Sequence, residues 1–238
     1  MSTSFPMPYS IRHSRRAKHL RLVAKPEGIE LVVPPTVSES RALAFLQKHR
    51  GWAERKLAEM RSVTPESRPK RGLQNGATLP FQGREVPLVV REHAGRRTYI
   101  RYDGHFLLSI PAGASENQDH LALKALFAWT RLWLRDEARS IAERHAPRFG
   151  LYPRQIRVKR MTSRWGSCGP MNDINLNWLL AFAPPSVLEY VVVHELCHIR
   201  HRNHSFDFWA LVAHHMPDYS SERQWLRLNG ATLLRRFE

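Results

Sequence analysis

The chain has 238 residues, 42% of them hydrophobic, so it can bury a core as one large domain or two small ones. Its 37 Lys and Arg against 21 Asp and Glu give a formal net charge of +16, which predicts attraction to nucleic acid or another polyanion. No apolar run approaches the roughly 20 residues of a membrane span, and no secretory signal is evident. The two cysteines, Cys168 and Cys197, cannot form a disulfide framework. We expect a cytoplasmic protein without membrane association.

The first half of the chain is predicted to be rich in strands, with one helix. Short strands at 20–24 and 29–33 flank a turn that contains a proline and a glycine. A helix with Ser38 as its N-cap follows and ends at Thr64-Pro65. The stretch 62–76 is rich in Pro, Gly, Arg and Ser, which predicts a linker or a long loop.

A second strand-rich segment, 77–110, leads into a second helix. Seven residues of the first strand–helix segment recur 77 positions later, which suggests an internal duplication. The residues of the first copy are Leu31, Pro34, Ser38, Glu39, Leu46, Trp52 and Leu57. In the same order, they recur as Leu108, Pro111, Ser115, Glu116, Leu123, Trp129 and Leu134. The second helix is therefore expected from about 115 to 146, before Pro147 and Gly150.

The last part of the chain is predicted to contain two strands and then a capped helix. One strand fits 156–160, and the polar–apolar alternation of 174–178 predicts a half-exposed strand. Pro184-Pro185 breaks the chain, and Ser186 with Glu189 matches a capping box at the start of the next helix.

This last helix carries the motif His194-Glu195-Leu196-Cys197-His198. Two histidines four residues apart lie on one helical face, so both rings can reach one metal ion while Glu195 stays close enough to handle a proton. Two neutral imidazoles and a third protein ligand leave one tetrahedral position of Zn²⁺ for water, whose pKa the ion lowers to roughly 7. The pattern predicts a zinc hydrolase with Glu195 as the general base.

The third ligand is expected to be His204. His201 lies on the same helical face as His194, but seven residues of helix place it about 10.5 Å along the axis, too far for one ion. His204 can return to the ion if the helix ends first, and Asn203 tolerates the left-handed backbone that such a turn uses. Glu222 stays open as the alternative third ligand, because it follows His198 by 24 residues and some His-Glu-x-x-His enzymes draw a glutamate from a later helix at a similar spacing.

The chain resembles the YgjP-like metal-dependent hydrolases, which are zincins akin to SprT-like and minimal gluzincin metallopeptidases. The resemblance covers nearly the whole chain, and its specific motifs lie between Arg164 and Trp209. The matching residues are Arg164-Trp165-Gly166-Ser167-Cys168, Asn175-Leu176-Asn177-Trp178, Pro184-Pro185, Tyr190 to His198, Asn203-His204-Ser205 and Phe208-Trp209. It implies that His194, His198 and His204 are metal ligands and that Glu195 is the base. Both peptide hydrolysis and hydrolysis of nucleoside triphosphates to monophosphate and pyrophosphate are attributed to the family.

Three functions remain open from the sequence. A metallopeptidase-like hydrolase would use strand 174–178 as an edge for an extended peptide, with Arg164, Asn175 and Asn177 as substrate contacts. A nucleoside triphosphate pyrophosphohydrolase would use the same metal site with arginines on the phosphates, although the chain has no Gly-rich phosphate loop. A non-catalytic module would use zinc as a staple and the basic surface to bind nucleic acid, but a closed structural site needs a fourth ligand rather than a base.

The expected architecture is α+β. A β-rich N-terminal domain with one helix is predicted over residues 1–112, with the linker near 62–76. A zincin-like domain is predicted over 113–238, in which a long helix supports a small sheet and the His-Glu-x-x-His helix.

Overall fold

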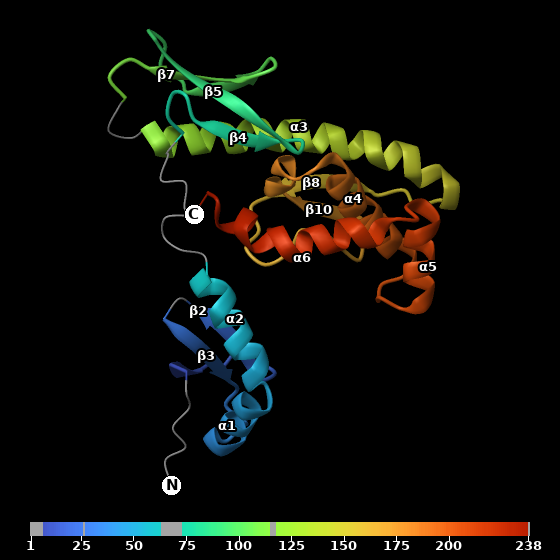
Figure 1. Cartoon of the computed structure of the whole chain (residues 1–238). Helices are drawn as coiled ribbons and strands as arrows, with labels where there is room; N and C mark the ends of the chain where they lie inside the picture. The colour runs from blue at the N-terminus through green and yellow to red at the C-terminus, as the bar shows by residue number, and fades with distance from the viewer. Residues whose placement is uncertain (1–6, 26, 63–72, 115–117, 238) are drawn as a thin grey trace. The chain divides into compact units, whose positions relative to one another are not determined.

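The computed structural model describes residues 7–25, 27–62, 73–114 and 118–237 (Figure 1). The chain forms two compact units, Met1–Lys70 and Arg71–Glu238. The predicted boundary at 112/113 is therefore displaced, because the second sheet packs on the long helix that follows it. The α+β class is confirmed, since helices and small mixed sheets make up the described residues.

The first unit is a three-stranded sheet with two helices on one face (Figure 1). The central strand β3 pairs in parallel with β1 and antiparallel with β2. Alternate residues of β3, Ile29, Leu31 and Val33, pack against the helices, which is the period-two pattern of a sheet with one covered face. The elements are β1 (Tyr9–His13), β2 (Arg21–Lys25), β3 (Gly28–Val33), α1 (Glu39–Lys48) and α2 (Arg50–Ser62).

Three local features of this unit bear on the sequence predictions. Ser38 is the N-cap of α1, as predicted, and its hydroxyl accepts from the backbone N–H of Arg41. The single predicted helix is divided in two at His49, which ends α1 outside helical geometry. Gly28 has φ of 150°, and a Cβ there would lie 2.4 Å from the carbonyl oxygen of Pro8. The start of β3 therefore requires a glycine.

The second unit begins with the sheet β4-β5-β7-β6, which packs on the N-terminal part of α3. Phe81, Phe106, Trp129 and Trp133 form an aromatic cluster between them, with ring centroids 4.7–6.2 Å apart. The elements are β4 (Thr78–Phe81), β5 (Arg84–His93), β6 (Tyr99–Tyr102), β7 (Phe106–Pro111) and α3 (Gln118–Phe149).

The predicted duplication is matched by the topology of the two sheets. In each case a first strand lies parallel to the central strand, a second strand lies antiparallel to it on the other side, and a helix follows. β1, β2 and β3 thus correspond to β5, β6 and β7. Residues 115–117, at the predicted start of the second helix, lie outside the described residues.

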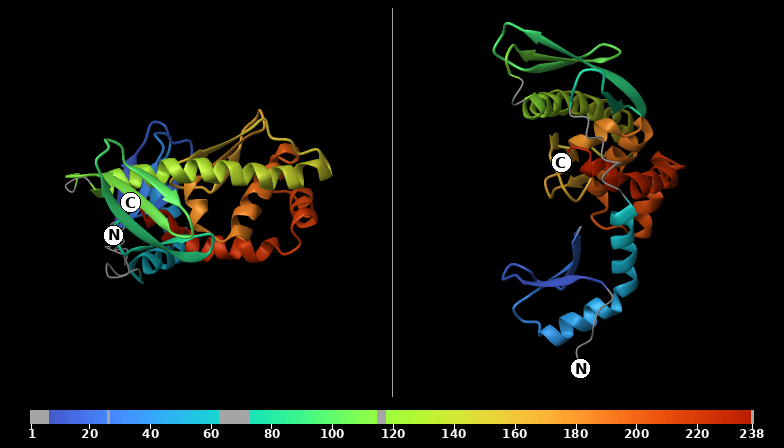
Figure 2. Two further views of the ribbon diagram at one scale, coloured as in Figure 1. Left: turned by 90° about the horizontal axis from the view of Figure 1, so that it is seen from above. Right: turned by 60° about the vertical axis from the view of Figure 1, so that its left-hand side comes forward.

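The remaining elements lie along the other side of α3, as Figure 1 and the right view of Figure 2 show. A small sheet of order β8-β10-β9 packs beside α3 and α4, and α4 contacts α3, α5 and α6. α3 is therefore the predicted long support helix. The elements are β8 (Gln155–Lys159), β9 (Gly166–Cys168), β10 (Asp173–Asn177), the 3₁₀ helix η3 (Trp178–Phe182), α4 (Pro185–Arg200), α5 (Phe206–His215) and α6 (Tyr219–Arg235).

In the described part of the chain, the helices are too short or too polar to span a bilayer.

Candidate metal centre

The motif lies on α4, most of whose residues between Val187 and Cys197 are buried among α3, α5, α6 and the small sheet. Pro184 is the N-cap of α4 and Pro185 its first residue, so the helix starts without a side-chain cap. The predicted capping box is wrong, because Glu189 instead accepts hydrogen bonds from Arg144 and from His145 on α3, both at 2.9 Å. This ion pair fixes α4 against the support helix.

Three imidazoles converge at the C-terminal end of α4. One ring nitrogen from each of His194, His198 and His204 lies within 4.8 Å of the others. The Nε2 atoms of His194 and His204 are 3.1 Å apart. These three residues form the one such His, Cys, Asp or Glu cluster with metal-binding spacing in the described residues, and they are the three that the sequence predicts as ligands.

The chain turns back to His204 at His201 rather than at Asn203. His201 ends α4 with an extended backbone, φ −117° and ψ 105°, whereas Asn203 does not have a positive φ. The predicted left-handed turn is therefore wrong, although the chain still brings His204 back to His194 and His198. Glu222 lies outside the histidine cluster and accepts a hydrogen bond from the Ser221 hydroxyl at 2.8 Å.

The environment of the rings favours neutral imidazoles, the form that binds metal ions. Burial, together with the neighbouring His198 and His204, lowers the pKa of His194 to about 3. Burial also lowers the pKa of His198. The Nδ1–H of His198 donates to the carbonyl oxygen of His201 at 2.9 Å, which leaves Nε2 unprotonated and facing the cluster. The donor set therefore fits a zinc ion.

Glu195 is buried beside the cluster without a charged partner. Its side chain is 5% exposed, and Oε2 has no hydrogen-bond partner among the described residues. Burial raises the pKa of Glu195 to about 8, and Arg164 opposes that rise. An unpaired buried carboxyl group is costly, so its position at the cluster indicates a chemical role.

Gly166 makes room for this carboxyl group, a role that the sequence analysis missed. A Cβ at Gly166 would lie 2.5 Å from Oε1 of Glu195 and 2.7 Å from its Cγ. No side chain larger than hydrogen fits between β9 and Glu195 without a shift. The glycine at this place in the Arg164–Cys168 motif is the only sequence signal of this contact.

Aromatic rings hold the histidines in place. Phe208 on α5 is fully buried and contacts all three rings, with centroid distances of 4.5–4.9 Å. Trp209 stacks on His204 at 5.6 Å, and the guanidinium of Arg223 lies 4.5 Å from the Trp209 ring centroid. Arg223 is thus a second cation near the cluster, and the sequence analysis did not identify it.

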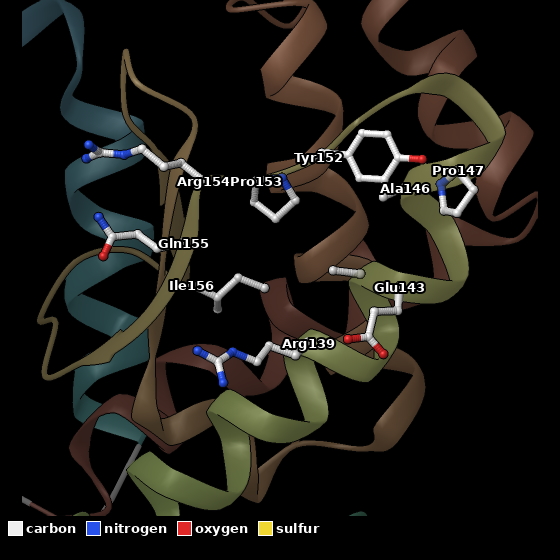
Figure 3. Close-up of a pocket in the computed structure, with 10 residues that line it drawn as sticks. Arg139, Glu143, Ala146, Pro147, Tyr152, Pro153, Arg154, Gln155 and Ile156 are labelled. Carbon is white, nitrogen blue, oxygen red and sulfur yellow. The ribbon is translucent and has the colours of Figure 1, made fainter.

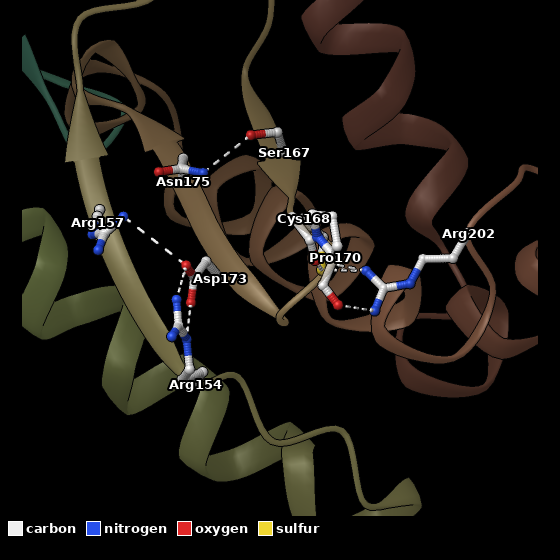
Figure 4. Close-up of polar contacts among 9 residues, drawn as sticks. Arg154, Arg157, Ser167, Cys168, Pro170, Asp173, Asn175 and Arg202 are labelled. Carbon is white, nitrogen blue, oxygen red and sulfur yellow. Dashed lines mark hydrogen bonds and ion pairs between the residues drawn. The ribbon is translucent and has the colours of Figure 1, made fainter.

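Arg202 ties the loop that carries His204 to the turn between β9 and β10 (Figure 4). It donates to the carbonyl oxygens of Gly169 at 2.8 Å and Pro170 at 3.4 Å, and to Oδ1 of Asn172 at 2.5 Å. It also donates to Sγ of Cys168. The loop between the second and third histidines is therefore anchored to the small sheet.

The predicted edge strand 174–178 does not lie at an edge; the edge strands of the small sheet are β8 and β9, and β9 is the one that lies against Glu195. β10 is the central strand, paired with β8 on one side and β9 on the other. Backbone bonds join Gly169 to Asp173 and Asn177 to Trp165. In an antiparallel ladder the hydrogen-bonded pairs alternate, so the backbone groups of Gly166 and Cys168 point away from β10.

The two predicted asparagine contacts do not lie at the cluster. Gly166, which abuts Glu195, is the register partner of Leu176, so Asn175 and Asn177 lie on the opposite face of the strand. Asn175 donates to the Ser167 hydroxyl there (Figure 4). Asn177 is fully buried and donates to two carbonyl oxygens of the 161–164 loop, so its predicted substrate contact is wrong.

Arg164, the third predicted contact, is exposed and lies close enough to Glu195 to affect its pKa. It has no ion pair among the described residues, so its guanidinium is available to a substrate.

A separate cavity of about 560 Å³ lies between α3 and the start of β8 (Figure 3). Its lining includes Arg139, Glu143, Tyr152 and Arg154, all exposed, and none of the three histidines. Arg154 is held by two hydrogen bonds to Asp173 (Figure 4). This cavity is not part of the metal centre.

A family model described as a YgjP-like metallopeptidase domain matches residues 18–229. The chain belongs to the YgjP-like family. This match confirms the resemblance, and it spans the three histidines, Glu195 and Gly166. Searches of curated proteins and of solved structures found no match. Membership of the YgjP-like family makes the chain a metallopeptidase-like hydrolase.

Proposed function

We propose that the protein is a zinc-dependent hydrolase that cleaves peptide bonds, with His194, His198 and His204 as the ligands and Glu195 as the general base. The observation that carries this proposal is the combination of three converging imidazole nitrogens, within 4.8 Å of one another, and a neighbouring buried carboxyl group without a partner. When bound, zinc would supply a Lewis acid and lower the pKa of coordinated water.

Glu195 would take a proton from the attacking water and return it to the leaving amine. Its burial supports this exchange, because a carboxyl group with a pKa near neutrality can both accept and release a proton at physiological pH. A purely structural zinc site needs four protein ligands, whereas this cluster has three. That difference disfavours the non-catalytic alternative.

The open edge of β9 supports a peptide as substrate. An extended chain added beside β9 would pair with the backbone groups of Gly166 and Cys168 and pass directly beside Glu195. Arg164 lies at the same end of β9 and would donate to the substrate carbonyl oxygen as negative charge develops there.

Hydrolysis of nucleoside triphosphates is the second candidate, favoured by the two cations near the cluster. Arg164 acts on the pKa of Glu195, and Arg223 acts on that of His194. Guanidinium groups at such positions suit phosphate oxygens. The peptide proposal ranks first because the strand edge lies directly against the proposed base.

The deciding experiment is a paired assay of the zinc-loaded chain with unfolded casein and with each nucleoside triphosphate. We expect casein cleavage that falls on the order of 10²–10⁴-fold in Glu195→Gln, the usual contribution of a general base, while zinc content stays the same. If instead the parent chain hydrolyses a nucleoside triphosphate and Glu195→Gln does not, the assignment changes from peptide hydrolysis to triphosphate hydrolysis. Full turnover of any substrate by Glu195→Gln would refute Glu195 as the base.

A further inference from the structure

The first unit carries a set of basic residues that the proposed hydrolytic site does not use. From Tyr9 to Lys25 the sequence contains six cations and no acidic residue. Five of the six are exposed, and the Lys25 side chain is 40% exposed. We call them the basic patch: Arg12, Arg15, Arg16, Lys18, Arg21 and Lys25.

The strand topology gathers these residues although they lie on two strands and a loop. Arg12 on β1 and Arg21 on β2 are both register partners of Val32 on β3. Neighbouring strands lie about 4.8 Å apart, so the two arginines flank β3 at a separation of roughly 10 Å. The connection 14–20 crosses the C-terminal end of β3, where the N–H of Ser14 donates to the carbonyl oxygen of Val33 at 3.0 Å. That crossing brings its three cations next to both strands.

The strand cations lie on the face of the sheet that the helices leave uncovered. Ile29, Leu31 and Val33 point into the core under α1 and α2, so Glu30, Val32 and their register partners lie on the other face. Glu30 is the acidic residue of that face. It accepts hydrogen bonds from Arg12, at 2.8 Å, and from Lys25.

This pairing leaves most of the positive charge unbalanced. The remaining four cations have no ion pair among the described residues; they are Arg15, Arg16, Lys18 and Arg21. Exposed cations that are not neutralised within the fold are suited to a partner with closely spaced negative charges.

We propose that the basic patch binds the phosphate backbone of a nucleic-acid duplex. A duplex carries one phosphate per about 1.7 Å of helix axis, and cations that contact the backbone release its counterions. Single-stranded nucleic acid is bound largely by stacking of bases on aromatic rings. Neither the connection 14–20 nor the described strand residues of this face contain Phe, Tyr or Trp; those strand residues are Ser10, Arg12, Arg21, Val23, Lys25, Glu30 and Val32. Backbone contacts of this kind do not select a base sequence.

The test is fluorescence anisotropy of the full-length chain with a DNA duplex of about 20 base pairs, repeated from about 50 to 200 mM salt. The test variant replaces Arg15, Arg16, Lys18 and Arg21 with alanine. Its matched control removes the same charge from exposed residues elsewhere, Arg41, Lys48, Arg55 and Arg131. Each phosphate contact contributes about 0.9 to the slope of log affinity against log salt, so the test variant should lose about three to four from that slope. The control should stay near the parent.

Three outcomes would overturn the proposal: equal losses in the test variant and the control, tighter binding of a single strand of the same length, or binding to phosphatidylserine vesicles without binding to the duplex. If the fourfold variant fails to fold, Arg15→Ala/Lys18→Ala should lose about half of that change in slope, and an unchanged slope would be contrary evidence. The result does not depend on hydrolysis, because the patch shares no residue with the metal centre.

Discussion

Two buried carboxyl groups, Glu195 at the metal centre and Glu30 in the first unit, have opposite electrostatic environments. Glu195 is 5% exposed and Oε2 has no partner among the described residues, and burial raises its pKa to about 8. Glu30 is 8% exposed, and hydrogen bonds from Lys25 and Arg12 lower its pKa. A paired buried carboxylate fixes its neighbours, whereas an unpaired one is costly to retain unless it has a chemical task.

The largest expected effect is an opposite pH dependence of stability at the two sites. In the metal-free chain, folded Glu195 keeps a proton that the unfolded chain releases above its ordinary pKa of 4.5. Its contribution to the free energy of unfolding is therefore lost as pH rises from about 4.5 to 8, on the order of 4 kcal/mol. Histidines with lowered pKa values, such as His194 and His215, gain stability over the same pH range in the parent and in Glu195→Gln. Urea unfolding at pH 5 and pH 8 should therefore show that the free energy of unfolding of the parent falls relative to that of Glu195→Gln by this amount.

Glu30 should behave in the opposite sense. Its lowered pKa gives stability that is present above its ordinary pKa of 4.5 and lost as pH falls through the lower folded value. Unfolding of Glu30→Gln should therefore vary less with pH below 4.5 than unfolding of the parent. If the free energy of unfolding varied with pH in the same way in Glu195→Gln and in the parent, the contrast between Glu195 and Glu30 would be refuted.

Substitution of Gly166 by alanine tests whether catalysis depends on the position of the Glu195 carboxyl group. Gly166→Ala should lower kcat by about 10- to 100-fold, because a misplacement near 1 Å can cost that much, while zinc affinity stays unchanged. Gly169→Ala is the matched control, since its Cβ would lie 3.6 Å from the nearest atom, an ordinary contact. Equal losses in both variants would show that the effect is not specific to Glu195.

A smaller effect is expected from the anchor of the His204 loop. Arg202→Ala should weaken zinc binding on the order of tenfold, the lower end of the range for residues that orient metal ligands. Competition with a chromophoric chelator measures this change, with exposed Arg227→Ala as the control. An unchanged affinity would mean that His204 holds its place without the link to the β9–β10 turn.

The sequence predicted the three histidines and Glu195 of the metal centre better than the contacts that surround them. The spacing of His194 and His198 on one helical turn is a local property, and the end of a helix before His204 is also readable from the chain. The sequence analysis predicted β2 and β3 from short strand-like runs around a turn, but it missed β1, although Tyr9, Ser10, Ile11 and Arg12 alternate between apolar and polar. The parallel pairing of β1 with β3 depends on residues about 20 positions away.

The errors at Glu189 and Asn177 share a cause, because each concerns which partner a residue finds across the fold. Glu189 matches a capping box but contacts α3, and Asn177 resembles a polar exposed residue but is buried under the loop that it holds. The proximity of Gly166 to Glu195 depends on how β9 packs on α4. Local patterns carry no information about such contacts.

The most direct test of the central claim is the zinc stoichiometry of the purified chain and of its triple variant His194→Ala/His198→Ala/His204→Ala. We predict one tightly bound zinc ion per parent chain, none in the triple variant, and full binding in a control with His214→Ala, a histidine outside the cluster. Stoichiometric zinc that survives removal of all three histidines would contradict the account.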